Sequence, residues 1–226
     1  MRATLVAALL VLLAGAPSVA RPQVSFQIDA PGVSIGLNVP MLPQLVRVPG
    51  YPVYYAPRVG GNYFFYDGMY WVLQGDTWYQ SVWFNGPWTP VPPVAVPAFL
   101  LRVPVRYYRA PPPWFAGWRA DRPPRWGEHW GHDWEHRRAG WDRWDRHAAP
   151  PPAPLPAYQR EYAGERYPRP DEQPGLHSRY YSYRPRDAEV RQAYASHGVH
   201  PGPPPGHDRG GGEKHGHGEG HGHGHD

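Results

Sequence analysis

The chain has 226 residues, and its 32 prolines and 26 glycines make up about a quarter of the length without a strict period. This composition predicts a compact region of roughly half the chain and a disordered remainder. The absence of cysteine excludes disulfide bonds, thiol nucleophiles and anchors on a lipidated cysteine. The formal net charge is +4, but arginines are interleaved with Asp and Glu, so no stripe of one sign predicts a nucleic-acid partner.

Residues 1–20 have the three parts of a secretory signal. Arg2 supplies the positive charge, residues 3–14 are apolar without interruption, and residues 18–20 offer a small-residue cleavage site. We expect cleavage after Ala20, with residues 14–16 as the alternative site. The apolar run is shorter than the ~20 residues needed to cross a bilayer, and no later run reaches that length. The sequence therefore predicts a periplasmic or secreted protein without a transmembrane segment.

Residues 21–110 are predicted to form an aromatic β-meander domain that begins with a hairpin and a proline-rich strap. Apolar residues alternate in segments 24–28 and 33–39, with Pro31 and Gly32 between them as a turn. From residue 40 to residue 57 a proline recurs every few positions with tyrosines between, which favours extended backbone. We expect the hairpin to cover one face of the meander and the strap to lie on it.

Residues 63–88 (YFFYDGMYWVLQGDTWYQSVWFNGPW) are the segment that organises this domain. Turn signals at residues 67–68, 75–76 and 85–86 favour two-residue turns that match the twist of paired strands. They set a register with Tyr66 opposite Met69, Phe64 opposite Trp71, Leu73 opposite Trp78, Val72 opposite Tyr79, and Trp83 opposite Trp88. Pro87 and Pro90 fit only an edge strand.

Both faces of the meander are predicted to be apolar. One face collects Phe64, Tyr66, Met69, Trp71, Leu73, Trp78, Val82 and Phe84, and the other collects Tyr63, Phe65, Tyr70, Val72, Tyr79 and Trp83. A sheet with one solvated face would show polar residues there, so this sheet needs cover on two sides. The favoured interpretation is an aromatic core. The alternative is an exposed aromatic platform for sugar rings or proline-rich peptides, with Trp83 and Trp88 as the residues to test.

Residues 111–149 are predicted to form a tryptophan-rich helix that packs on the meander. Just before them, residues 99–103 have the pattern of another short strand. From Trp126 the indoles follow at Trp130, Trp134, Trp141 and Trp144, which lie on one helical stripe. Asp121 is the predicted N-cap, and the helix should end by Ala149 before a proline run. Gly127 and Gly131 each cost about 1 kcal/mol relative to alanine, so packing must stabilise this helix.

Residues 150–226 are predicted to be a disordered linker and a histidine-rich tail. Segments 158–167 and 187–194 have helical patterns but are too short to hold alone. The tail alternates histidine with glycine, and its candidate metal ligands are His207, His215, His217, His221, His223 and His225. Imidazoles on so adaptable a backbone suit Zn, Ni or Cu, and binding should fade below about pH 6.5 as the rings protonate. The alternative is a soluble low-complexity end without a metal role.

Histidines also occur within the predicted helix. His132 and His136 are four residues apart, and Glu128 precedes His132 by four, so ligands could share one helix face. The HExxH pattern of zinc proteases is missing, and a solvated face is the favoured interpretation. There is also no phosphate-binding loop and no GxSxG elbow. We therefore expect a protein without enzymatic activity and without a required cofactor.

The pattern PGYPVYYAP…NYFFYDGMYWVLQGDTWY…NGPW…RVPVRYYRAPPP…PPRWGEHWG, within residues 24–150, resembles a group of exported, uncharacterised proteobacterial envelope proteins rich in Tyr, Trp and Pro. It is also loosely similar to the WXXGXW repeats of bacterial envelope proteins. The nearest match is Trp71, Gly75 and Trp78, with one extra residue in each gap. The resemblance implies export and no particular activity.

The predicted fold is mostly β: a small antiparallel meander of about four to six strands, covered by one Trp-rich helix and followed by a disordered Pro/Gly/His-rich C-terminal region. The predicted function is that of a non-enzymatic envelope protein with an interaction or metal-buffering role. The alternative function is a glycan- or peptidoglycan-binding module that uses exposed aromatic residues. The expected partners are divalent metal ions, an envelope polysaccharide or another envelope protein.

Overall fold

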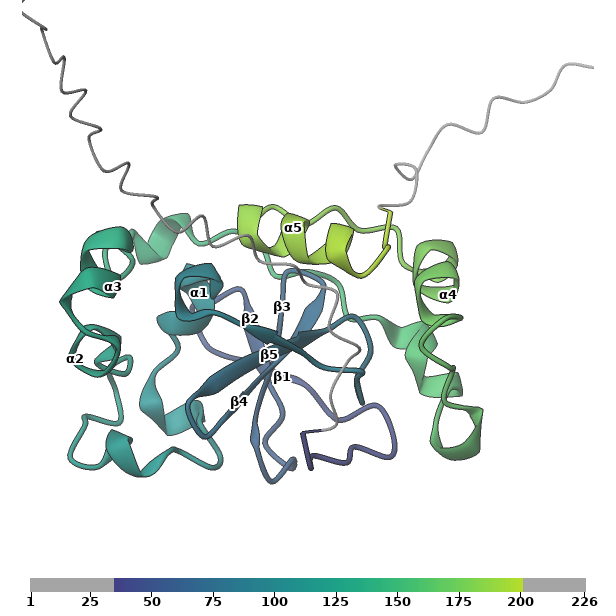
Figure 1. Cartoon of the computed structure of the whole chain (residues 1–226), viewed down its shortest axis with the longest axis horizontal. Coiled ribbons are helices and arrows are strands. Elements are labelled where there is room, and N and C mark those ends of the chain that lie inside the picture. Colours follow the sequence, from purple (N-terminus) through teal and green to yellow (C-terminus); the bar gives the residue numbers. More distant parts are fainter. Residues whose placement is uncertain (1–34, 201–226) are drawn as a thin grey trace, which may run out of the picture.

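A computed structural model of the chain describes residues 35–200. At its centre is a six-stranded antiparallel sheet in which the order of the strands follows the chain. Figure 1 shows this sheet in the middle of the molecule with helices around it. The strands are β1 (Val46–Arg47), β2 (Val53–Tyr55), β3 (Asn62–Tyr66), β4 (Met69–Gln74), β5 (Thr77–Ser81) and β6 (Thr89–Val91). The predicted antiparallel meander is therefore confirmed.

The first two aromatic hairpins have the predicted register. Tyr66 pairs with Met69 across the first turn, and Leu73 pairs with Trp78 across the second. Asp67 and Gly68 have φ values of 49° and 93°, the left-handed region that a two-residue turn of this kind requires. Local turn chemistry is thus sufficient to set these pairings.

The third predicted pairing is wrong. Strand β5 ends at Ser81, whose hydroxyl accepts a hydrogen bond from the Trp83 backbone N–H at 3.1 Å. The strand that follows pairs Gln80 with Thr89 instead of Trp83 with Trp88. Because alternation stops at Ser81, Trp83 packs on the face predicted for Phe84, and Phe84 packs on the opposite face.

The proline-rich strap joins the sheet instead of lying on it. A tight turn with a hydrogen bond from the Val48 N–H to the Val53 carbonyl (2.9 Å) folds it into β1 and β2. Its prolines at 49 and 52 fall in that turn, which leaves the backbone of β2 able to pair with β3. Residues 35–39 of the predicted N-terminal hairpin form no strand, and the rest of that hairpin lies outside the described residues.

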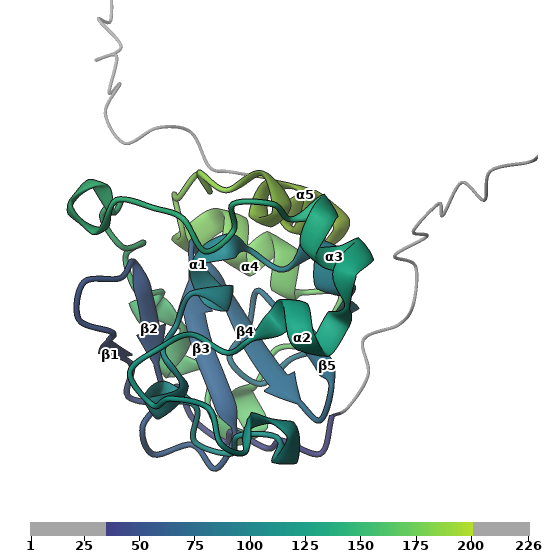
Figure 2. The same ribbon diagram turned by 90° about the vertical axis from the view of Figure 1, so that its left-hand side faces the viewer.

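The α-helices frame the sheet. They are α1 (Ala98–Leu101), α2 (Trp126–Trp130), α3 (His132–Arg137), α4 (Gln173–Tyr180) and α5 (Ala188–Ser196). Short 3₁₀ helices occur at Pro93–Ala95, Val105–Tyr107, Pro113–Phe115, Arg146–Ala148, Ala157–Glu161 and Gly164–Arg166. Figure 2 shows α1, α2 and α3 in front of the strands and α4 behind them, with α5 along one end of the sheet.

The helical and strand contents do not support the predicted mostly-β class. Among the described residues 31% are helical and 15% are in strands. One reason is α1, which occupies the segment predicted as a strand. Pro97 precedes it, the sequence Ala-Phe-Leu-Leu favours helix, and Leu100 and Leu101 become fully buried. A short apolar run of this kind does not distinguish strand from helix by its pattern alone.

The single tryptophan-rich helix is also corrected. Gly131 has a φ of 83° and ends α2, and α3 begins at the next residue and ends at Arg137. Residues 138–142 form turns, and the segment from there to residue 149 is irregular apart from one short 3₁₀ helix. The predicted packing of the indoles on the meander is nevertheless found for Trp126 and Trp134, which are buried in the same core cluster as Trp71.

Residues 150–200 are ordered against the sheet, so the prediction of disorder from residue 150 is wrong for this part. Val190 and Tyr194 of α5 join one core cluster, and Ala153 and Tyr181 join the cluster on the other face. The sheet supplies the burial that these short helices lack alone. The tail from residue 201 onward lies outside the described residues. Both faces of the sheet are covered, as the double-apolar pattern predicts.

Candidate ligand-binding cleft

A chain of aromatic side chains runs from the core to the surface through residues 114–130. At its inner end the indole of Trp126 donates to the Leu101 carbonyl at 2.9 Å, and its ring lies 6.0 Å from the ring of Trp78. At the outer end Trp118 is half-buried and stacks on Phe115, with ring centroids 4.8 Å apart. Core packing fixes the inner indoles and leaves the outer one accessible.

A second aromatic wall is held in place by Arg102, at the end of α1. Its guanidinium lies 5.4 Å from the ring centroid of Trp144 and donates to the Arg143 carbonyl at 3.2 Å and to the Trp141 carbonyl. The ring of Trp144 lies 5.1 Å from that of Tyr51. Burial lowers the pKa of Arg102, because desolvation penalises its charge. The turn at residues 141–144 is thereby tied to α1.

The outer members of the two aromatic groups line a cleft of about 650 Å³. Sites for small molecules and cofactors commonly have volumes of about 300–1,000 Å³. Three half-buried tryptophans, Trp118, Trp141 and Trp144, contribute to its lining, together with Tyr51 from the turn between β1 and β2. Segments far apart in the sequence therefore build one site.

The cleft carries a net positive charge, because its arginines outnumber its carboxylates. The charged lining residues are Arg102, Arg119, Arg122, Arg125, Arg146, Glu128, Glu135 and Asp142. Arg119 pairs with Asp121 at 2.9 Å and Arg125 with Glu128 at 3.0 Å, and such exposed pairs contribute at most about 1 kcal/mol. Within residues 35–200, Arg122 and Arg146 make no ion pair. Their guanidinium groups remain available to a ligand.

This combination of side chains suits a ring-shaped ligand that carries an anionic group. Indole faces provide flat apolar area for the C–H face of a ring. A guanidinium donates two parallel hydrogen bonds to a carboxylate or phosphate, which an ammonium does not. The guanidinium of Arg125 lies over the ring of Trp118, 5.5 Å from its centroid, so a cation and an indole are neighbours at this edge of the cleft.

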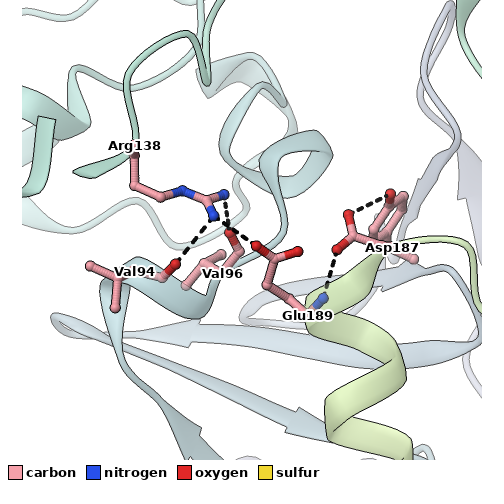
Figure 3. Close-up of polar contacts among 6 residues, drawn as sticks. Val94, Val96, Arg138, Asp187 and Glu189 are labelled. Atoms are coloured by element: carbon pink, nitrogen blue, oxygen red, sulfur yellow. Dashed lines mark hydrogen bonds and ion pairs between the residues drawn. The ribbon is translucent and has the colours of Figure 1, made fainter. Parts of the chain in front are cut away.

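A second polar cluster joins α5 to the sheet and to the end of α3 (Figure 3). Asp187 caps α5: its carboxylate accepts from the Glu189 backbone N–H at 3.1 Å and from the Tyr66 hydroxyl at 3.1 Å. Glu189 accepts from Arg138 at 2.9 Å. The same guanidinium donates to the carbonyls of Val94 and Val96 at 3.2 and 2.8 Å.

The pKa values of the two carboxyl groups in this cluster are shifted in opposite directions. Burial and the neighbouring Glu189 raise the pKa of Asp187 to about 7. The hydrogen bond with Asp187, together with Arg138, lowers the pKa of Glu189. Asp187 is therefore the member of this coupled pair that holds a proton more readily, and Glu189 is the member that stays ionised. Since both groups are committed to contacts within the protein, we interpret the cluster as a structural junction that responds to pH.

The histidine ligands predicted in the tail, at residues 207–225, lie outside the described residues. Among residues 35–200, no group of three or more His, Asp or Glu side chains is placed to hold a metal ion. His129 stacks on Trp114 with ring centroids 3.6 Å apart and contacts the Asp76 carboxylate. Glu128 pairs with Arg125, and the helix break at Gly131 takes Glu128 out of line with the histidines of α3.

The exposed aromatic platform that the alternative interpretation of the sequence assigns to Trp83 and Trp88 is not found at these residues. Trp83 and Trp88 are 0% and 2% exposed, so neither can contact a glycan. The accessible indoles come from residues 118–144 instead. The sequence signal for this surface is the interleaving of tryptophan and arginine between prolines and glycines in RAPPPWFAGWRADRPPRWG, which helical periodicity does not reveal.

The sequence pattern also gave no sign of a buried polar chain between β4 and α4. The Tyr70 hydroxyl donates to Gln159 Oε1 at 3.0 Å, and Gln159 Nε2 donates to the Val82 carbonyl at 2.9 Å and to the Tyr158 hydroxyl at 3.0 Å. Tyr158 in turn contacts Nδ1 of His177 at 3.0 Å. His177 is fully buried, and burial lowers its pKa to about 3. The ring is therefore neutral in the folded protein at physiological pH.

No protein-family model, curated protein or solved structure matches this chain. Within residues 35–200, no helix has the length and apolar character needed to cross a membrane. The cleft and the sequence patterns therefore carry the functional interpretation.

Proposed function

We propose that the mature chain is an exported binding protein that holds an anionic glycan in the cleft and catalyses no reaction. The observation that carries this proposal is the convergence of Trp118, Trp141 and Trp144 with Arg122 and Arg146 around one cleft of about 650 Å³. The signal pattern of residues 1–20 supports a location in the cell envelope or outside the cell. Acidic polysaccharides of the envelope, peptidoglycan included, offer sugar rings and carboxylates together.

The charge of the cleft favours an acidic glycan over a neutral one. Exposed guanidinium groups next to indoles would be left without a partner by a neutral sugar, whereas a uronic acid satisfies both kinds of group. Electrostatic attraction should also make binding weaker at high ionic strength, because exposed charges are screened within about 10 Å at 0.1 M salt. A purely aromatic platform would show little of this dependence.

The test compares calorimetric titrations of the mature protein with oligogalacturonate, with neutral galactan oligosaccharides and with soluble peptidoglycan fragments. Removing a central aromatic or arginine contact commonly costs more than about 1 kcal/mol, so Trp118→Ala and Arg122→Gln should each weaken acidic binding about fivefold or more. Arg109→Gln is the matched control, since Arg109 is exposed and does not line the cleft. Equal binding by the wild-type protein and both cleft variants contradicts the proposal. Equal binding of neutral and acidic oligosaccharides contradicts its electrostatic part.

A second proposed role, metal buffering, rests on the tail sequence EKHGHGEGHGHGHD. Alternating histidine and glycine supplies many imidazoles on a backbone that can adapt to Zn, Ni or Cu. Calorimetric titration with each metal should show several bound ions in the wild-type chain and a large loss when the tail histidines are replaced by glutamine. Unchanged metal uptake in that variant would exclude the tail as the buffering site and would leave the cleft proposal unaffected.

A further inference from the structure

Two histidines of α3 lie side by side on the surface. His132 and His136 are both exposed, and their Nε2 atoms are 2.9 Å apart. The ring centroids are 4.3 Å apart and the rings are inclined by 80°. This contact is a hydrogen bond when one Nε2 carries a proton, and both Nε2 atoms become metal donors when each neutral ring holds its proton on Nδ1.

We propose that His132 and His136 form a chelating site for Cu²⁺ or Ni²⁺ that is separate from the tail. Two imidazole nitrogens at about 2.05 Å from a metal and 90° apart are separated by about 2.9 Å, whereas tetrahedral angles require about 3.3 Å. The observed separation matches neighbouring positions of a square-planar or tetragonal ion. Exposure leaves the remaining positions to water or to ligands from solution.

The rigid attachment of α3 gives this pair its affinity. Trp134, between the two histidines, is 2% exposed and anchors the helix in the core. Arg138, directly after the helix, donates to the carbonyls of Val94 and Val96. Two imidazoles held one helical turn apart therefore bind an ion with little loss of conformational entropy, since the second contact is intramolecular. A single surface imidazole lacks this advantage.

The test uses the full-length chain with its tail histidines replaced by glutamine, so that the tail no longer competes. Cu²⁺ alone is the probe, followed by calorimetry and by electron paramagnetic resonance at neutral pH. We expect one ion with two coordinating imidazole nitrogens. His132→Gln or His136→Gln should weaken its binding roughly tenfold or more, because the chelate is lost. His147→Gln is the matched control, because His147 is also exposed but has no histidine partner within residues 35–200.

Two results would overturn the proposal. One is equal Cu²⁺ affinity in the tail-substituted chain and in its His132→Gln/His136→Gln derivative. The other is binding of Zn²⁺ as tight as that of Cu²⁺, which would contradict the inferred geometry. Circular dichroism and tryptophan fluorescence of the variants should match those of the parent chain, as expected for exposed positions. Because the tail ligands are absent throughout, failure here is separate from failure of the buffering role or of glycan binding.

Discussion

His177 should make the stability of the fold fall as the pH is lowered. The ring is fully buried in α4, and its pKa is lowered from 6.5 to about 3. Below pH 6.5 the unfolded chain takes up a proton that the folded protein excludes. The contribution of this group to stability is therefore complete above pH 6.5 and is lost progressively as the pH falls toward 3.

The size of this loss of stability follows from the difference between the pKa of His177 in the unfolded and the folded protein. Each unit of pH between the two pKa values changes the free energy of unfolding by about 1.4 kcal/mol, so His177 removes about 2 kcal/mol between pH 7.5 and pH 5.0. Domains commonly have a total stability of only about 5–15 kcal/mol. One buried imidazole thus controls a large fraction of the stability in mildly acidic surroundings.

The assay is urea unfolding followed by tryptophan fluorescence, at pH 7.5 and pH 5.0, for the wild-type protein and for His177→Gln. Glutamine stays neutral and can still bond to the Tyr158 hydroxyl. The loss of stability between the two pH values should be about 2 kcal/mol smaller in the variant than in the wild type. Titrating groups that do not interact with His177 cancel in this comparison, whereas His197 belongs to the effect, because its charge also lowers the pKa of His177. His147→Gln, which changes an exposed ring, should behave as the wild type does. Equal pH dependence in the wild type and His177→Gln would refute the reasoning.

Three further predictions concern the sheet and its contacts. Gly68→Ala should destabilise the protein by more than about 2 kcal/mol in urea unfolding. The new Cβ would lie 2.2 Å from the Tyr194 hydroxyl, and the φ of Gly68 is positive. Gly75→Ala is the control and should cost less, because Gly75 also has a positive φ but no atom lies near its Cβ position. The raised pKa of Asp187 stabilises the fold below about pH 4, and that contribution is lost as the pH rises through 7. In Asp187→Asn the urea concentration at the unfolding midpoint should therefore depend less on pH between pH 5.5 and pH 8. The same pH dependence as in the wild type would contradict this. Asn62→Ala should lower the free energy of unfolding by about 1–3 kcal/mol, since buried backbone groups lose their partner; a cost near zero in the same assay would show that water replaces it.

The parts of the fold that the sequence predicts well are set by local chemistry. The hairpins around Asp67-Gly68 and Gly75-Asp76 have the expected register because only a few residue types tolerate the positive φ that these turns require. Residues 187–194 have a helical pattern that is too short to hold alone, and in the structure Asp187 caps the helix that forms there. After Ser81 the Trp83 backbone N–H donates to the Ser81 hydroxyl, and this competing hydrogen bond ends the strand early. The alternation of side chains along the sequence does not reveal it.

Segments that depend on distant partners are the ones that the sequence does not predict. Residues 150–200 are rich in proline and short of apolar runs, which are features of disordered chains. Their tyrosines nevertheless form hydrogen bonds with backbone groups of the loop between β5 and β6. The Tyr167 hydroxyl accepts from the Asn85 N–H at 3.0 Å and donates to the Gly86 carbonyl at 2.5 Å. The composition of residues 150–200 indicates an irregular backbone. It does not indicate that the sheet buries the side chains of these residues.

The same dependence explains why the candidate cleft lies where regular structure ends. A continuous helix through residues 126–149 would keep its indoles on one stripe and bury them together. The left-handed Gly131 and the turns after Arg137 interrupt that stripe, so Trp126 and Trp134 stay in the core while Trp141 and Trp144 reach the surface. Gly131 stands between α2 and α3 at a positive φ that glycine adopts without strain, so the break fits the residue that occupies it. Stability alone would favour burial of these tryptophans. A break in the helix that leaves them half-exposed beside arginines is therefore the kind of feature expected of a binding surface.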